Sequence, residues 1–333
     1  MDVVRLSHPT ARLTERRRAR SIAALLTAVW VLTLGGCTTE RDPAGGAGTA
    51  DAERGSGSYG ESIRRPGSGE FAFQPLAPPD ADPLTVRYVA PKGGASTADI
   101  LIVLHGTGRN GEGYRDAWVP LVRDRNVLVL VPEFPEEDFP GSSYNTGNML
   151  DEDEDPLPPK RWAFPVIEQL FDDVVADVDS DATDYALFGH SAGAQFVHRF
   201  VEFGKPRKLR VAVAANAGWY TTLDDSVDFP YGLGDSPSSE SRMAPALATD
   251  LVLLLGADDV DPEDDSLRRN EESDAQGVNR LQRGMHFFLT SREMAAERSL
   301  PFAWGMTVVP GVAHSHPDMA AAAAPILLGP EGG

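Results

Sequence analysis

A serine flanked by two glycines follows an apolar run near the middle of the chain. The run Tyr185–Phe188 is typical of a buried strand, Gly189-His190-Ser191-Ala192-Gly193 comes next, and a helical pattern begins at Ala194. A strand that turns sharply into a helix brings its backbone close to neighbouring chain, so the residues two before and two after the serine must be small. The spacing therefore predicts that Ser191 projects from a strand-to-helix turn. The alternative is a glycine-rich turn with an idle serine.

Short apolar runs alternate with helical patterns along much of the chain. Continuous apolar runs suit buried parallel strands, and Val166–Val178 places its apolar residues at helical spacing. Strands that alternate with helices give a mostly parallel central sheet with helices on both faces, which is an α/β fold. The runs are Leu84–Val89, which alternates apolar and polar residues as a half-buried strand does, Ile100–Leu104, Val127–Val131, Tyr185–Phe188, Leu209–Ala214, Leu251–Leu255 and Met306–Val309.

A nucleophilic serine needs a base, and the base needs a carboxylate that orients it. In a fold of this kind they follow the serine in the order acid, then histidine. The carboxylates after the sixth apolar run are Asp258, Asp259 and Asp261. The last run is followed by His314 and His316, of which His314 lies nearer the end of the strand. The order predicts His314 as the base.

Hydrolysis through a serine also requires N–H donors for the oxyanion. One is expected from Ala192, the residue after the nucleophile, and the other from the loop after an earlier strand. The stretch His105-Gly106-Thr107-Gly108 follows the strand that ends at Leu104. We expect the Thr107 N–H to be the second donor, and His105 to orient the loop without acting as a base.

Four motifs in this order resemble those of the α/β-hydrolase superfamily, over about residues 84–327. Within the superfamily the chain looks like the bacterial secreted esterases grouped with polyhydroxyalkanoate depolymerases and feruloyl esterases. The resemblance implies the α/β-hydrolase fold and selects Asp259 as the acid, because the family's acid commonly lies three residues after a strand-ending glycine. The chain differs from disulfide-linked secreted members because Cys37 is its only cysteine. The motifs are HGTG at 105–108, GHSAG at 189–193, GADD at 256–259 and PGVAH at 310–314.

The reaction expected from this resemblance is hydrolysis of a small or polymeric carboxylic ester through an acyl-enzyme, with no metal and no cofactor. Trp219 and Tyr220 follow a strand and are expected either to contact the substrate or to pack under a lid. The same triad would serve a serine peptidase or amidase. A non-catalytic, surface-anchored binding lipoprotein of the same fold is the remaining alternative, but its expected signature, a lost triad member, is not seen.

The formal charge of −20 at pH 7 limits the choice of partner. A strongly acidic surface repels phosphates, which argues against a nucleic-acid partner.

The first 36 residues are typical of a lipoprotein signal peptide. Arg16–Arg18 precede the apolar run Ile22–Leu34, which is too short to span a bilayer as a helix, and small residues lead to Cys37. A lone cysteine at this place resembles the lipobox of bacterial lipoproteins, in which the cysteine is lipidated. The alternative is ordinary cleavage nearby, with an unused thiol.

The composition divides the rest of the chain into two parts. Residues 37–70 are rich in Gly, Ser, Ala, Asp and Arg and predict a flexible, lipid-anchored linker. Residues 71–333 form the expected catalytic domain. We therefore expect an exported protein of the cell envelope that is attached to a membrane through Cys37, on the extracytoplasmic side.

The lipid anchor can be tested by replacing its cysteine. Cys37→Ser should move the protein from the detergent-extracted membrane fraction to the soluble fraction, because the acyl chains that hold it would be lost. Thr38→Ser, which leaves the cysteine in place, should remain with the membrane. If Cys37→Ser stays in the membrane fraction, another segment is the anchor.

Overall fold

The computed structural model describes residues 59–79, 81–237 and 240–329. The expected signal peptide, Cys37 and most of the expected linker lie outside these residues. Among the described residues, no helix combines the length and the apolar character that crossing a membrane would require.

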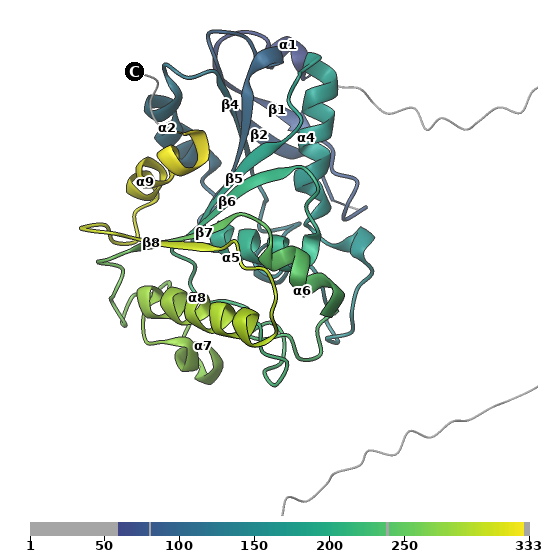
Figure 1. Cartoon of the computed structure of the whole chain (residues 1–333). Coiled ribbons are helices and arrows are strands. Elements are labelled where there is room, and N and C mark those ends of the chain that lie inside the picture. Colours follow the sequence, from purple (N-terminus) through teal and green to yellow (C-terminus); the bar gives the residue numbers. More distant parts are fainter. Residues whose placement is uncertain (1–58, 80, 238–239, 330–333) are drawn as a thin grey trace, which may run out of the picture. The chain divides into compact units, whose positions relative to one another are not determined.

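Eight strands form one sheet in the order β1-β2-β4-β3-β5-β6-β7-β8 (Figure 1). The pairs β1·β2 and β2·β4 are antiparallel, and all other neighbours are parallel. The predicted fold, a mostly parallel sheet, is therefore confirmed. The strands are β1 (Gly67–Phe73), β2 (Leu84–Ala90), β3 (Asp99–Leu104), β4 (Val127–Pro132), β5 (Tyr185–His190), β6 (Leu209–Ala215), β7 (Leu251–Gly256) and β8 (Gly305–Val309).

The folded part of the chain begins before the expected boundary at residue 71. Strand β1 starts at Gly67, and a short helix precedes it. Most side chains of β1 are exposed or only partly buried, so the strand lacks the apolar run that marks the others. Its place in the sheet comes from backbone pairing with β2, from Gly67 opposite Ala90 to Phe73 opposite Leu84.

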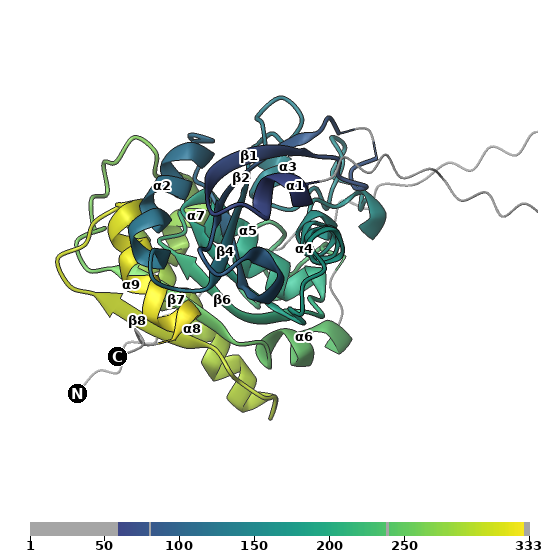
Figure 2. The same ribbon diagram turned by 90° about the horizontal axis from the view of Figure 1, so that it is seen from above.

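Helices cover both faces of the sheet. Helices α2 and α9 lie on one face, and α4, α5, α6 and α8 lie on the other (Figures 1 and 2). The helices are α1 (Gly60–Ile63), α2 (Gly111–Val122), α3 (Gly141–Tyr144), α4 (Pro165–Val178), α5 (Ala192–Arg199), α6 (Glu240–Leu247), α7 (Glu271–Gln276), α8 (Arg280–Glu297) and α9 (His316–Leu328), with helical turns at Ala95–Thr97, Pro159–Arg161 and Phe200–Gly204.

The strand β3 shows why the central strands are apolar throughout. Side chains alternate between the two faces of a strand. Ile100, Ile102 and Leu104 pack in the core under α4 and α5, whereas Leu101 and Val103 pack in the core under α2 and α9. Because both faces are covered, neither set of side chains meets water.

The turn between β5 and α5 has no room for larger side chains at its glycines. A Cβ atom on Gly189 would lie 2.3 Å from the carbonyl oxygen of Gly193, and one on Gly193 would lie 2.4 Å from the carbonyl oxygen of Leu104. Ser191 between them has a φ of 58°, a left-handed conformation that a serine rarely adopts. The local structure of the predicted strand-to-helix turn is thus present.

Gly193→Ala should destabilise the protein, because the new methyl group collides with the backbone of β3. We expect a loss of about 1–3 kcal/mol of unfolding free energy, seen as a melting temperature lowered by several degrees. Gly108→Ala is the matched control, since a Cβ atom there meets nothing within 4 Å. Equal melting temperatures for the two variants would contradict the close approach of α5 to β3.

Candidate active site

The structure brings together three residues that are far apart in the sequence. Ser191, Asp259 and His314 lie just beyond the carboxyl ends of β5, β7 and β8. His314 Nε2 is 3.1 Å from Ser191 Oγ, and His314 Nδ1 is 2.7 Å from Asp259 Oδ2. In this geometry a histidine can accept the proton of the serine while the carboxylate fixes the tautomer and orientation of the imidazole.

Asp259, and not its neighbours, faces the histidine. Its side chain is buried, whereas Asp258 and Asp261 are exposed. Its second oxygen, Oδ1, accepts a hydrogen bond of 3.2 Å from the buried guanidinium of Arg280. Arg280 also donates to Asp264 and Ser266, so it fastens the loop after β7 to helix α8. One carboxylate oxygen is thereby held by Arg280, and the other is left for His314.

Asn216, at the end of β6, hydrogen-bonds both to the end of β7, before the loop of Asp259, and to the loop of His314. Its side-chain oxygen accepts a hydrogen bond of 2.7 Å from the Gly256 N–H, and its amide group donates to the Ala313 carbonyl at 3.0 Å. Gly256 itself has no space for a side chain, since a Cβ atom there would lie 2.4 Å from the Val312 carbonyl oxygen. These contacts place the loop that carries His314 beside the loop that carries Asp259.

The two expected oxyanion donors lie on neighbouring elements. Ala192 is the first residue of α5, where backbone N–H groups have no acceptor within the helix. In the part of the chain that the structure describes, the Thr107 N–H makes no hydrogen bond. The loop of Thr107 approaches the serine closely, because a Cβ atom on Gly106 would lie 3.4 Å from Ser191 Cβ. Both amides are therefore free to bind an oxyanion.

His105 holds this loop in place. Its Nδ1 lies 2.9 Å from the Gly106 carbonyl oxygen, and its Nε2 accepts a hydrogen bond from the Phe134 N–H. The proton is therefore on Nδ1. Burial lowers the pKa of His105 to about 4, so the ring is neutral at pH 7. The hydroxyl of Tyr144 donates to the His105 carbonyl at 2.8 Å and supports the same loop.

Two other histidines, His190 and His316, lie near His314 but make no hydrogen bond to Ser191. The His190 ring lies 4.6 Å from the His314 ring, and its Nδ1 is 2.9 Å from the Tyr114 hydroxyl. Burial, and then the nearby His314, hold the pKa of His190 well below its usual value. His316 stacks on Tyr114, and burial lowers its pKa as well. Of the two histidines that follow β8, only His314 contacts the serine.

The two aromatic residues after β6 are both buried. Tyr220 is fully buried and stacks on Phe287 of α8, with ring centroids 4.7 Å apart. It therefore packs against α8, and its contact with substrate stays a prediction. Trp219 lies under two arginine side chains, of which Arg268 is exposed.

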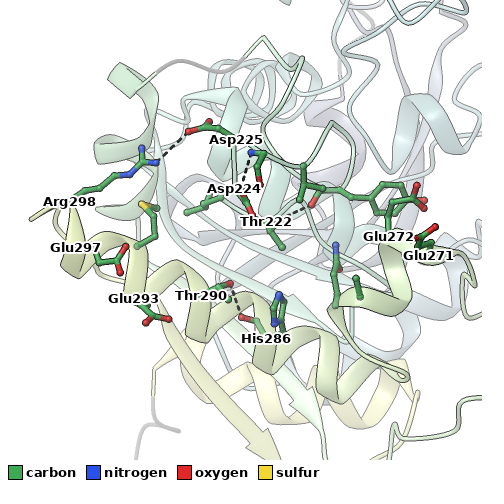
Figure 3. A pocket seen from close by; sticks show the side chains of 17 residues that line it. Thr222, Asp224, Asp225, Glu271, Glu272, His286, Thr290, Glu293, Glu297 and Arg298 are labelled. Carbon is green, nitrogen blue, oxygen red and sulfur yellow. Dashed lines mark hydrogen bonds and ion pairs between the residues drawn. The ribbon is translucent and has the colours of Figure 1, made fainter. Parts of the chain in front are cut away.

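A wide groove of about 1010 Å³ lies between the loop after β6 and helices α7 and α8 (Figure 3). None of the three residues Ser191, Asp259 and His314 lines it. Its acidic side chains are Asp224, Asp225, Glu271, Glu272, Glu293 and Glu297. The groove is thus separate from the triad, and its charge repels anions.

Comparison with known proteins identifies the class to which this site belongs. No protein-family model and no curated protein matches the chain. Among solved structures, poly(aspartic acid) hydrolase-1 from Sphingomonas sp. KT-1 is similar at 42% identity with a TM-score of 0.76, over 79% of this chain and 99% of that one. LpqC, a poly(3-hydroxybutyrate) depolymerase from Bordetella parapertussis, is similar at 29% identity with a TM-score of 0.76, over 81% of this chain and 92% of that one.

The chain is therefore a serine hydrolase of the α/β-hydrolase superfamily. It belongs to the same family as poly(aspartic acid) hydrolase-1. The resemblance to polyhydroxyalkanoate depolymerases expected from the motifs is confirmed by LpqC.

Replacing each aspartate after β7 by asparagine tests which one orients the histidine. Asp259→Asn should lower kcat by roughly 10⁴-fold, because a neutral amide neither fixes the tautomer nor stabilises the imidazolium. Asp258→Asn should stay within about tenfold of wild type, or about 1.4 kcal/mol of barrier. Both are measured on p-nitrophenyl butyrate.

Circular dichroism must accompany this measurement, since Asp259→Asn also leaves the buried Arg280 without its carboxylate partner. A folded but inactive Asp258→Asn beside an active Asp259→Asn would show that the assignment is off by one residue.

Proposed function

We propose that this hydrolase cleaves carboxylic esters through an acyl-enzyme on Ser191. The observation that carries the proposal is the continuous hydrogen-bonded chain from Ser191 through His314 to Asp259. His314 takes the hydroxyl proton as Ser191 Oγ attacks the acyl carbon, and the Thr107 and Ala192 N–H groups hold the oxyanion. His314 then gives the proton to the leaving oxygen. A water molecule repeats the sequence on the acyl-enzyme and releases the acid.

The residues around His314 favour the positively charged imidazolium that forms when His314 takes the proton of Ser191. Asp259 stabilises the imidazolium as it forms. The neighbouring His190 is neutral, since burial holds its pKa low, and so it adds no second positive charge beside His314. Arg280 donates to the other oxygen of Asp259, so it holds the carboxylate in place without contacting the imidazole.

The substrate we propose is a polymer of short carboxylic acids. The two similar enzymes act, by their names, on poly(aspartic acid) and on poly(3-hydroxybutyrate). In both polymers the acyl carbon of one unit is bonded to a heteroatom of the next, so both suit an acyl-enzyme. The polymers differ in the scissile bond, an amide or an ester, and in the group that each unit carries, a carboxylate or a methyl.

Amide hydrolysis is the second candidate, and the 42% identity to poly(aspartic acid) hydrolase-1 favours it. The same triad attacks both bonds, so substrates must separate them. A panel of p-nitrophenyl esters, aminoacyl nitroanilides and sodium poly(aspartate) makes the comparison directly.

We also propose that the enzyme works outside the cytoplasm as a lipoprotein. The basis is the signal-peptide pattern and the placement of Cys37 as the only cysteine. A polymer too large to enter the cell is degraded only where an exported enzyme can reach it. A linker between the lipid and the domain would let the active site reach such a chain.

Labelling with a fluorophosphonate probe tests the nucleophile. The probe should label wild type and should not label Ser191→Ala, because it reacts with an activated serine. Ser96→Ala is the control: its side chain is exposed on the turn before β3, at the amino end of that strand and away from the carboxyl ends that carry the site, and it should label like wild type. Equal labelling of Ser191→Ala and wild type would refute the proposal, and a wild type that takes no label would favour a non-catalytic binding protein.

A further inference from the structure

Two arginines and two aromatic rings form a cluster next to the active-site helix α5. The Arg199 guanidinium carbon lies 4.1 Å from the ring centroid of Trp219, and that of Arg268 lies 5.2 Å from it. Arg268 is also 5.5 Å from the ring centroid of Tyr231, which packs against Trp219 at 4.8 Å. We call these four residues the Trp219 cluster. Guanidinium groups stack on aromatic faces, and Trp provides the strongest such site.

The cluster is anchored to the helix that begins directly after the nucleophile. Arg199 is the last residue of α5, and it donates to the Gln195 carbonyl on the same helix at 3.2 Å and to the Asn145 carbonyl at 3.0 Å. Gly218, next to Trp219, is packed against Gln195, because a Cβ atom on Gly218 would lie 3.2 Å from its side-chain nitrogen. The position of Trp219 is therefore fixed relative to Ser191.

Arg268 differs from the arginines around it. Arg269 and Arg283 form ion pairs with Asp274 at 3.0 and 2.9 Å, and Arg280 pairs with Asp259. Within residues 59–79, 81–237 and 240–329, the guanidinium of Arg268 makes no hydrogen bond or ion pair, although its loop contains several carboxylates. It is exposed to solvent.

The second arginine of the cluster, Arg199, makes no ion pair among the described residues. Arg199 is fully buried and donates only to uncharged oxygens. Glu202, whose charge acts on Arg199, is also buried, and among the described residues neither of its oxygens has a hydrogen-bond partner. Burial raises the pKa of Glu202 far above its usual value, although Arg199 opposes the shift. Arg268, which is exposed and has no ion pair among the described residues, gives the cluster a positive charge in a chain of net charge −20.

We propose that Arg268, which lies over the Trp219 ring, binds a carboxylate of the substrate, so that the enzyme takes an anionic polymer. This inference rests on the proposed function. The guanidinium N–H groups of Arg268 donate to no described residue, and they match the two oxygens of a carboxylate. A methyl group, as in poly(3-hydroxybutyrate), has no oxygen that could accept a hydrogen bond from these N–H groups. Tyr231 belongs both to this cluster and to the lining of the acidic groove, whose charge repels an anionic chain from that side.

Inhibition by sodium poly(aspartate) tests the binding without requiring that the amide bond be cleaved. The full-length enzyme hydrolyses p-nitrophenyl butyrate, and poly(aspartate) is added as a competitor. Arg268→Gln should raise the inhibition constant at least tenfold more than it changes the KM for the neutral ester, because only the polymer carries carboxylates. Arg268→Lys should retain part of the affinity, since it keeps the charge but loses the planar fork.

Arg269→Gln is the matched control, because it removes a neighbouring arginine that is already paired with Asp274. It should leave the inhibition constant within about twofold of wild type. The inference is overturned if poly(aspartate) does not inhibit wild type, or if Arg268→Gln and Arg269→Gln weaken inhibition equally. A wild type that hydrolyses the ester but ignores poly(aspartate) refutes only the carboxylate site, whereas an enzyme inactive on esters refutes the proposed ester hydrolysis.

Discussion

The site depends on how closely the first turn of α5 approaches the end of β3. Gly193 lies against the Leu104 carbonyl with no room for a side chain, and Gly189 lies against Gly193 in the same way. This contact forces Ser191 into a left-handed conformation and brings it beside the Gly106 backbone. The nucleophile and both oxyanion amides are thus positioned by one backbone contact. The histidine and its carboxylate reach the serine from the neighbouring strands.

Much of this could be predicted from the sequence, because it has local causes. Burial on both faces makes strands such as β3 and β7 apolar throughout, so their positions are readable from composition alone. The glycines around Ser191 and the order of acid and histidine follow from the same fold. The choice of Asp259 over Asp258 required a family resemblance, since spacing alone left both open.

The remaining parts depend on tertiary contacts that leave no local pattern. Arg280 looks like any arginine at the start of a helix, and only the packing of α8 buries it against Asp259. Asn216 is a loop residue whose role comes from two loops that meet in space. Strand β1 has no apolar run because it lies at the edge of the sheet. Tyr220 is a further case, since its place after a strand left both packing and substrate contact open, and only the tertiary structure shows that it stacks on Phe287.

Two neighbouring regions of the surface carry opposite charge. The acidic groove beside α7 and α8 and the positive Trp219 cluster meet at Tyr231. In a chain of net charge −20, the guanidinium of Arg268, which has no ion pair among the described residues, gives an anion a favourable place to bind. On this account the triad performs the chemistry, whereas the loops after β6 and β7 choose the substrate.

The central claim is that Ser191 becomes acylated during turnover, and trapping the acyl-enzyme tests it most directly. The protein is quenched in acid while it hydrolyses p-nitrophenyl butyrate, digested, and analysed by mass spectrometry. The account predicts that the peptide containing Ser191 carries the mass of one butyryl group, and that the adduct is absent from Ser191→Ala. A butyryl group on another residue, or rapid turnover with no adduct on any peptide even when deacylation is slowed at low pH, would contradict it.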